Sequence, residues 1–492
     1  MKINKYIIRV FILISTFLFV KCEDVLKPEV FSETAPDNLF NSLQGVESVL
    51  NGAYAWVAEN QGNNLAQMIT ASEAMTDVGF GELGAIANWL LNFQDFVLDG
   101  VGSALYNKYW NSPYKAIRNA HIILENLDEA NISDGSKKLI RAEARFIRAI
   151  SYYKLYIRFG PTPLRTSSSQ ELELPRASEE DFIEFIETEL IDIIPDLPDP
   201  GEELKWGRAH KGAAMGILTK LYLNTKQWQK CAEAALDIMN LNYYELFPDY
   251  FELFMVKSER NKEMIWVHPC KADLGREANM SFMNFAWPQG FASHPATGLE
   301  FCEGCRSFAT MFKIRNDFWY SFDPADKRTS LMITEYVNSD GDTIICLPPD
   351  DNPRPFKYWP ADDFEGPAYG NDVPDIRYAD ILLSRAEALN EINGPNEESI
   401  DLINMVRDRA GVEYLNLSDF ASKEALRDHI LDERGWEFWW ERKRREDLIR
   451  HGEFIIRAQE RGLPAQPHHV RHPIPLEIMD ANSKLVQNED YY

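Results

Sequence analysis

The sequence predicts a mainly α-helical protein in which paired helices form a scaffold around one loop-rich insertion. Apolar residues recur at steps of three and four along several segments, as on the buried face of a helix. These segments follow one another in pairs that are separated by short turns. Between roughly residues 240 and 375 the periodicity stops, and Gly, Pro and aromatic residues become frequent. We therefore expect helices on both sides of an irregular middle segment.

Four helix pairs are expected, and their boundaries carry local signals. Ser178 is followed three residues later by Asp181, which is a capping pattern, and Gly160-Pro161 and Asn393-Gly394-Pro395 end helices. The expected pairs are 43–57 with 105–127, 138–159 with 178–195, 209–223 with 228–239, and 376–392 with 397–409. Their helix–turn–helix period is close to the ~34 residues of tetratricopeptide units. Because the pairs are scattered along the chain, a plain solenoid is not expected.

The chain is expected to consist of a signal peptide, residues 1–21, and a single domain, residues 22–492. The helical scaffold of this domain is assigned to about 36–240 and 375–492, and the loop-rich insertion to about 241–374. Two short runs in or near the insertion, 264–267 and 343–347, have strand-like composition. They are expected to form a small hairpin.

The N-terminus has the layout of a secretory signal. Basic residues precede a short apolar run that ends at Lys21-Cys22, and the run is too short to span a membrane comfortably. A cysteine at the expected cleavage point indicates a lipoprotein with Cys22 as the lipidated residue. Lys21 stands where a small residue is usual, so an ordinary signal peptide with an incidental Cys22 is the alternative. Either interpretation places the function outside the cytoplasm.

Composition and charge exclude several classes of protein. The chain has 45% apolar residues, which is enough for a folded core, and a formal net charge of −26. Such a field repels phosphate backbones, so nucleic acid is not an expected partner. Six cysteines are too few for a disulfide framework in 492 residues.

Two groups of potential metal ligands favour structural interpretations. Cys302 and Cys305 have the spacing of half a zinc site or a redox pair, but no second such pair exists. A local disulfide or two free buried thiols are favoured over metal. His468, His469 and His472 lie among prolines that force an extended chain, where successive side chains point to opposite faces. Neither a metal ion nor a cofactor is expected.

The basic run 442–445 resembles a nucleic-acid patch only superficially. It lies among acidic residues on an expected helix, where Glu441–Arg445 and Arg442–Glu446 have the spacing of solvated salt bridges. The known motifs of hydrolases, metalloproteases and nucleotide-binding enzymes are missing from the sequence. We expect no enzyme. A pair of carboxylates brought together by folding would still allow a surface glycoside hydrolase, which is the less favoured alternative.

The C-terminal third carries a family signature. Residues 377–383 read RYADILL and are followed by AEALNE at 386–391. Further matching segments are Glu433–Phe438, Asp447–Gly452, Pro473–Pro475 with Gln487-Asn488, and Ala142–Ala149. This order of motifs over nearly the whole mature chain resembles the SusD/RagB family of Bacteroidetes. One departure is Gly435, where the family usually carries a larger residue, and it is expected to weaken its helix by up to about 1 kcal/mol.

The resemblance implies a function as well as a fold. Members are outer-membrane lipoproteins that face the exterior, bind oligosaccharides and form the lid of a SusC-like TonB-dependent transporter. This implies a lipid anchor at Cys22, and Glu23-Asp24 resembles the acidic tag that directs such lipoproteins to the surface. The resemblance also implies an alternative, because a minority of RagB-like relatives bind peptides instead. Ligand contacts vary between members, so the resemblance assigns no binding residue.

Candidate ligand contacts come from the chemistry of sugars. Aromatic rings stack on the apolar faces of sugars, and neighbouring polar groups bind the hydroxyls. One Gly-rich loop offers Asp77, Phe80 and Trp89, and the insertion offers Phe285 and Trp287. These five residues are the predicted ligand-binding residues.

Overall fold

The computed structural model of the chain describes residues 39–58, 69, 71–82, 92–98, 104–272, 280–307, 312–361, 364 and 366–491. The predicted signal peptide, Cys22 and Trp89 lie outside the described residues, so their roles stay predictions. Among the helices that are described, none combines the length and the apolar character needed to cross a membrane.

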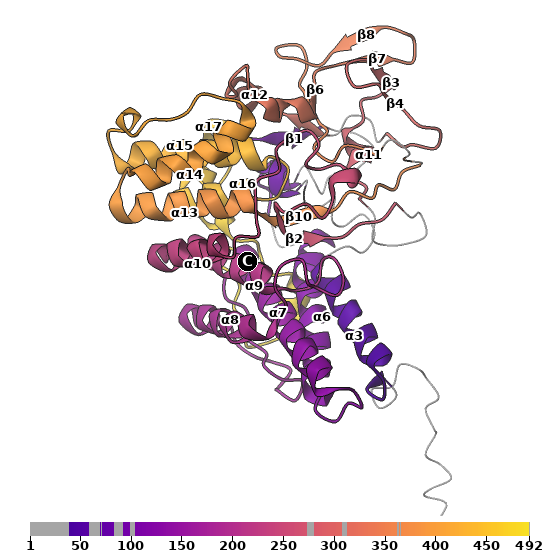
Figure 1. Ribbon diagram of the computed structural model, residues 1–492, viewed down its shortest axis with the longest axis vertical. Coiled ribbons are helices and arrows are strands. Elements are labelled where there is room, and N and C mark those ends of the chain that lie inside the picture. The colour runs from indigo at the N-terminus through magenta and orange to yellow at the C-terminus, as the bar shows by residue number, and fades with distance from the viewer. Residues whose placement is uncertain are drawn as a thin grey trace, which may run out of the picture.

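The N-terminal helices form the lower half of the molecule in Figure 1 and confirm three predicted pairs. They are α3 (Leu43–Val57), α6 (Ala104–Asn126), α7 (Asp134–Phe159), α8 (Glu179–Ile193), α9 (Lys211–Asn224) and α10 (Trp228–Asn240). Helix α3 packs on α6, α7 on α8, and α9 on α10. The Ser178 side chain accepts a hydrogen bond from the Asp181 N–H, which confirms the predicted cap of α8.

The C-terminal helices stack above α10 on one side of the molecule (Figure 1). They are α13 (Tyr378–Asn393), α14 (Glu397–Ala410), α15 (Lys423–Phe438), α16 (Arg444–His451) and α17 (Glu453–Glu460). A further short helix, α18 (Leu476–Ala481), is followed by residues that bind the segment before α8. Helix α13 contacts both α10 and α14, so the fourth predicted pair continues the N-terminal array. The predicted start at 376 was wrong by two residues, because Ile376 and Arg377 belong to a strand.

Short strands occupy the other side of the molecule (Figure 1). Three two-stranded sheets pair β1 (Gly79–Gly81) with β5 (Phe312–Ile314), β2 (Met264–His268) with β10 (Val373–Arg377), and β6 (Met332–Ile333) with β9 (Arg354–Pro355). A four-stranded sheet has the order β4 (Leu299–Glu300), β3 (Phe291–His294), β7 (Glu335–Asn338) and β8 (Thr343–Ile345). The expected hairpin between 264–267 and 343–347 was wrong, because β2 pairs with β10 and β8 pairs with β7.

Short helices punctuate the connections. Helices α11 (Met283–Ala286) and α12 (Asn316–Tyr320) lie in the predicted insertion. The 3-10 helices are η1 (Ile194–Asp196), η2 (Val256–Ser258), η3 (Lys327–Leu331), η4 (Leu417–Asp419) and η5 (Pro467–Val470).

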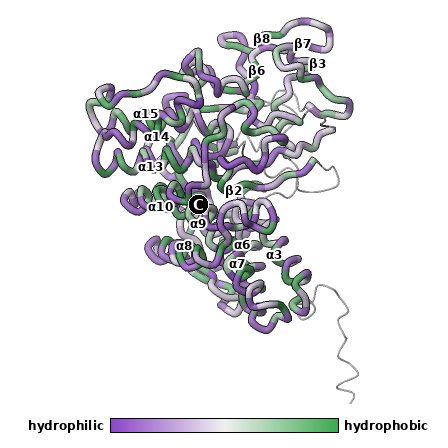
Figure 2. Tube along the Cα trace, in the orientation of Figure 1, coloured by the Kyte–Doolittle hydropathy of each residue, from purple (hydrophilic) through white to green (hydrophobic). Residues whose placement is uncertain are grey.

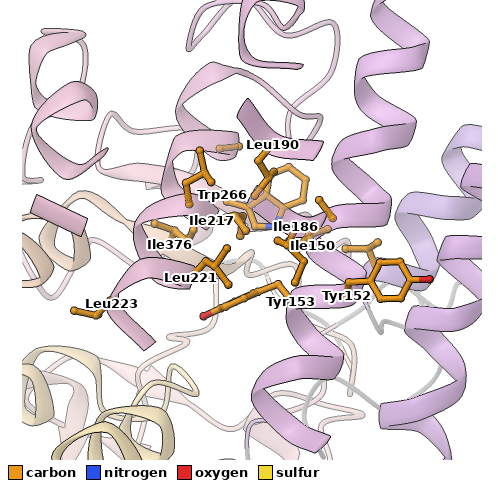
Figure 3. Close-up of a cluster of buried hydrophobic side chains, with 14 of the residues drawn as sticks. Ile150, Tyr152, Tyr153, Ile186, Leu190, Ile217, Leu221, Leu223, Trp266 and Ile376 are labelled. Atoms are coloured by element: carbon orange, nitrogen blue, oxygen red, sulfur yellow. The ribbon is translucent and has the colours of Figure 1, made fainter. Parts of the chain in front are cut away.

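Two apolar cores support these parts. The larger core joins the helices, and in Figure 3 side chains of α7, α8, α9, β2 and β10 gather in it, including Ile150, Ile217 and Ile376. The second core lies in the middle segment and includes Trp287, Trp439 and Trp440. Figure 2 shows hydrophobic and hydrophilic stretches alternating along the helices, as expected for elements with one buried face. The proposed domain boundaries remain a prediction.

The basic run 442–445 does not lie on the solvent-exposed helix that the sequence analysis had predicted. Helix α15 ends at Phe438, and Trp440 and Arg442 adopt positive φ angles of 57° and 65° before α16 begins. Glu441 is 1% exposed and pairs with Arg377 and Lys357 instead of Arg445. Arg442 pairs with Asp375 instead of Glu446. These charges are therefore buried in the structure and do not form a solvated face.

Candidate functional site

The signature residues of the C-terminal third form a buried ion network. Arg377 donates to both carboxylate oxygens of Glu441 at 2.8 Å. Arg434 binds Asp380 at 2.8 Å and Asp447 at 2.9 Å, and these side chains are no more than 1% exposed. Because buried charges are stable only when paired and hydrogen-bonded, this network fixes the positions of β10, α13, α15 and α16. The signature therefore supports the scaffold.

Asp77 lies where the first predicted ligand loop meets this scaffold. Its carboxylate accepts two hydrogen bonds from Arg444, both at 2.8 Å, and one from Arg457 at 2.7 Å. Burial by itself raises the pKa of Asp77, but these guanidinium groups outweigh it and hold the pKa well below its usual range. Asp77 is therefore an ionised anchor of the loop.

Two other arginines hold the same loop through its carbonyl oxygens. Arg315 donates to Thr76 O at 3.0 Å and to Ala74 O at 3.3 Å. Arg461 donates to Met75 O at 3.1 Å. Burial, followed by repulsion from Arg461, lowers the pKa of Arg315 to about 10. The loop is thus fixed from α12, α16 and α17 at once.

These side chains border a groove of about 480 Å³, which we call the arginine-rich groove. It is lined by Asp77, Asp317, Asp432, Glu453 and Glu460, by Arg315, Arg444, Arg457 and Arg461, and by Phe318, Ser321 and Trp436. The indole of Trp436 is half-buried, and its Nε1 donates to Ser321 Oγ at 2.9 Å, which fixes the ring plane. The groove therefore combines an ordered aromatic ring with many hydrogen-bonding groups.

The N-terminal and C-terminal parts of the chain each match a model of a known protein family. Residues 361–492 match the SusD family model, and residues 30–223 match a SusD-like model described as starch-binding and associating with the outer membrane. This chain belongs to the SusD/RagB family.

Curated SusD relatives extend over most of the chain. SusD-like protein P25 of Formosa agariphila is 26% identical over 99% of both chains. The starch-binding protein SusD of Bacteroides thetaiotaomicron is 24% identical over 71% of this chain and 72% of that protein. Proteins of this family are carbohydrate-binding.

Solved structures share the SusD fold. A laminarin-binding SusD-like protein superimposes with a TM-score of 0.76 and 21% identity, covering 91% of this chain and 99% of that one. A surface glycan-binding protein A of Bacteroides thetaiotaomicron in complex with laminarihexaose gives a TM-score of 0.72 and 18% identity. It covers 90% of this chain and 98% of that one. These likenesses confirm the predicted helical, SusD-like fold.

Phe80 and Phe285, two further residues predicted to contact ligand, lie in different environments. Phe80 is half-buried on β1, beneath the Arg315 guanidinium at 5.4 Å from its ring centre. Phe285 is 3% exposed and stacks on Phe312 of the neighbouring strand β5. Phe80 and Asp77 therefore lie beside the arginine-rich groove, whereas Phe285 packs under the β1–β5 ribbon.

Trp287 is fully buried. Its Nε1 donates to the Tyr369 hydroxyl at 2.8 Å, and Phe291, Phe301, Phe356 and Phe364 surround its ring. Stacking of a sugar on Trp287 would require this aromatic cluster to open. Its role as a ligand contact stays a prediction, as does that of Phe285.

The cysteine and histidine groups have structural partners. Cys302 and Cys305 form a disulfide, one of the two states that the sequence left open. His472 packs against Tyr109, and the rings of His468 and His469 contact each other. In the described part of the chain, no group of three or more histidine, cysteine or acidic residues could hold a metal ion.

Sequence reasoning missed Arg315, Trp436 and Arg461 as groove residues. Arg315 is more than 100 residues from Trp436 and Arg461 in the sequence, and helical spacing does not indicate which distant segments meet. Trp436 had one available signal, because it is a large aromatic residue among the charged residues of the matched segment 433–438. Its half-exposed position could have been tested only with the fold.

Proposed function

We propose that this protein binds oligosaccharides at the outer-membrane surface and passes them to a SusC-like TonB-dependent transporter. The observation that carries the proposal is the arginine-rich groove, in which the Trp436 ring is held in place beside carboxylates and guanidinium groups. A sugar presents apolar C–H faces to a ring and hydroxyls to charged acceptors and donors, so this groove suits a glycan.

The placement at the membrane rests on the family and on the N-terminal sequence. The family is described as associating with the outer membrane, and Cys22 is the proposed lipid site. A surface binder requires a pore that accepts its ligand, and a lipid tether keeps the binder and the pore at high effective concentration.

The binding proposal is tested by titrating the mature protein with a panel of oligosaccharides, including maltooligosaccharides and laminarioligosaccharides, and with oligopeptides of similar length. The expected result is saturable binding of at least one glycan class, with no reducing ends released on incubation. Binding of peptides alone would establish the RagB-like alternative. Release of reducing ends that scales with protein concentration would establish a hydrolase.

The anchor is tested by replacing Cys22. The Cys22→Ala variant should be released from the membrane fraction and should not incorporate labelled fatty acid, whereas wild type should remain in that fraction and incorporate the label. Unchanged fractionation of the variant would contradict lipidation at Cys22.

The transporter partner is tested by isolating the native lipoprotein in mild detergent. A large outer-membrane barrel protein should be recovered with it. Recovery of the lipoprotein alone in several detergents, together with normal growth on the cognate glycan after its deletion, would contradict the import complex.

A further inference from the structure

We propose that a second site, buried between α7, α9, β10 and the start of α16, binds a small tetrahedral oxyanion such as sulfate or phosphate. This site is separate from the arginine-rich groove, and the inference does not depend on the glycan proposal. The basic run 442–445, which the sequence predicted on a solvated helix, supplies much of the lining of this site.

The cavity at this place is small and has one apolar wall. Ile150 and Tyr153 of α7, Ile217 of α9 and Ile376 of β10 form that wall, and Figure 3 shows these four side chains close together. The cavity volume is about 70 Å³. One water molecule needs roughly 10–15 Å³, so the space holds about five to seven water-sized groups, which is enough for the heavy atoms of sulfate.

The polar wall is predominantly basic, although the protein carries a net charge of −26. Its basic residues are Lys154, Arg158, Lys220, Arg442, Lys443 and Arg445. The acidic residues are Asp375 and Glu446. A cluster of this sign inside an acidic protein needs a source of negative charge.

Known ion pairs account for part of this charge. Lys220 binds Asp380 at 3.0 Å. Asp375 accepts from Arg442 and His268 and lies 3.5 Å from Lys154. Glu446 is half-buried and accepts from the Asn224 side chain at 3.0 Å.

Arg445 and Lys443 bind carbonyl oxygens instead. Arg445 is 5% exposed, and within the described residues its hydrogen bonds reach only Val470 O at 2.9 Å and Ile157 O at 3.5 Å. Its Nε has no hydrogen-bond partner among those residues. Lys443 is 9% exposed and donates to the Asp375 carbonyl oxygen. Within the described residues neither cation forms a direct ion pair with a carboxylate, although Glu446 attracts Arg445 and Asp380 attracts Lys443 from a greater distance. A bound anion in contact with both cations would therefore stabilise them.

Two neighbouring features favour an oxyanion. Helix α16 begins at Arg444, so the positive end of its dipole lies at this wall. His472 also lines the cavity and is 3% exposed, and its Nδ1 has no partner within the described chain. Burial, followed by repulsion from Arg445, keeps the pKa of His472 well below its usual value, so the ring is neutral and donates one N–H. Oxygen atoms of a tetrahedral anion can accept from several such donors at once.

The test compares thermal unfolding of the mature protein in sodium chloride with unfolding in millimolar sulfate or phosphate at the same ionic strength. Wild type should gain Tm with a saturable dependence on oxyanion concentration. Arg445→Met and Lys443→Met should each raise the apparent Kd for the oxyanion by about tenfold or more. Arg427→Met is the matched control, because Arg427 pairs with Glu391 and lies on α15, which contributes no residue to the cavity, and this variant should respond like wild type.

A second measurement covers the case in which Arg445→Met does not fold. Crystals of wild type soaked in selenate should give an anomalous selenium peak in the cavity beside Arg445. Equal Tm values for wild type in chloride and oxyanion, equal responses of all four proteins, or a cavity that contains only water after the soak would each overturn the proposal.

Discussion

Arg377 and Glu441 form a bidentate ion pair in the interior, with Nε and Nη2 each 2.8 Å from a carboxylate oxygen and both side chains 1% exposed. Arg377 also binds Glu437 at 2.9 Å, and Lys357 binds Glu441 at 2.5 Å. This pair joins the RYAD segment to the turn between α15 and α16. The residues of the family signature therefore form a buried charge network that positions the helices on both sides of the groove.

Replacing Arg377 with Met should destabilise the protein strongly. The change leaves Glu437 and Glu441 buried with fewer partners, and breaking a buried pair in this way costs about 3–5 kcal/mol. Urea denaturation measures the loss. The control is Lys211→Met, because Lys211 pairs with Asp199 near the surface at 2.6 Å and should cost about 0–1 kcal/mol. Equal losses for the two variants would contradict the role of the network.

Replacing Glu73 with Gln should change how stability depends on pH. Burial raises the pKa of Glu73 to about 8, although the Arg442 N–H favours the charged form. The folded protein therefore keeps a proton on Glu73 that the unfolded chain releases above about pH 4.3, and this group alone lowers the stability of wild type by roughly 1.4 kcal/mol per pH unit between there and pH 8. Glu73→Gln removes this loss.

The expected result is that Glu73→Gln gains stability relative to wild type as pH rises from 5 to 8. Denaturant titrations at several pH values measure the difference. Other buried acids with raised pKa values, such as Glu259 and Asp372, are present in both proteins, so their contributions to the pH dependence cancel in the difference. Parallel curves for the two proteins would show that Glu73 is ionised in the fold.

Gly435 should be required despite its low helix propensity. A Cβ at this position of α15 would lie 2.8 Å from Arg444 Nη1, the side chain that anchors Asp77. Gly435→Ala should therefore lower stability, although helix propensity alone predicts a gain of up to about 1 kcal/mol. Gly135→Ala in the first turn of α7 is the control, because no atom lies within 4 Å of its new Cβ. A gain in stability for both variants would show that Arg444 moves aside freely.

Much of the scaffold could be predicted because its signals are local. The apolar stripe from Leu43 to Val57 and the Asn393-Gly394-Pro395 turn mark the ends of α3 and α13 almost to the residue. The ion-pair spacing around Arg442 failed as a signal, because α15 ends at Phe438 and Glu441 and Arg442 lie in the turn before α16, where Trp440 and Arg442 have positive φ angles. Spacing arguments hold only while the backbone remains helical.

The candidate site was less predictable because exposure depends on tertiary packing. Trp287 lies in a Gly- and Pro-containing run that is typical of a loop, yet five neighbouring aromatic rings enclose or contact it. The position of Asp77 in a Gly-rich loop predicts a ligand contact, and Asp77 does border the groove. The residues that complete the groove come from distant segments, and no local pattern brings Arg315 and Arg461 together.

The most direct test of the central claim is calorimetric titration of Trp436→Ala with the glycan that binds wild type most tightly. Loss of one stacked ring is worth about 1 kcal/mol, so affinity should fall about fivefold. Tyr414→Ala is the control, because Tyr414 is 60% exposed and lies outside the groove. The account predicts weaker binding for Trp436→Ala alone, with both variants folded at the assay temperature. Wild-type affinity in a folded Trp436→Ala protein would show that the glycan binds elsewhere.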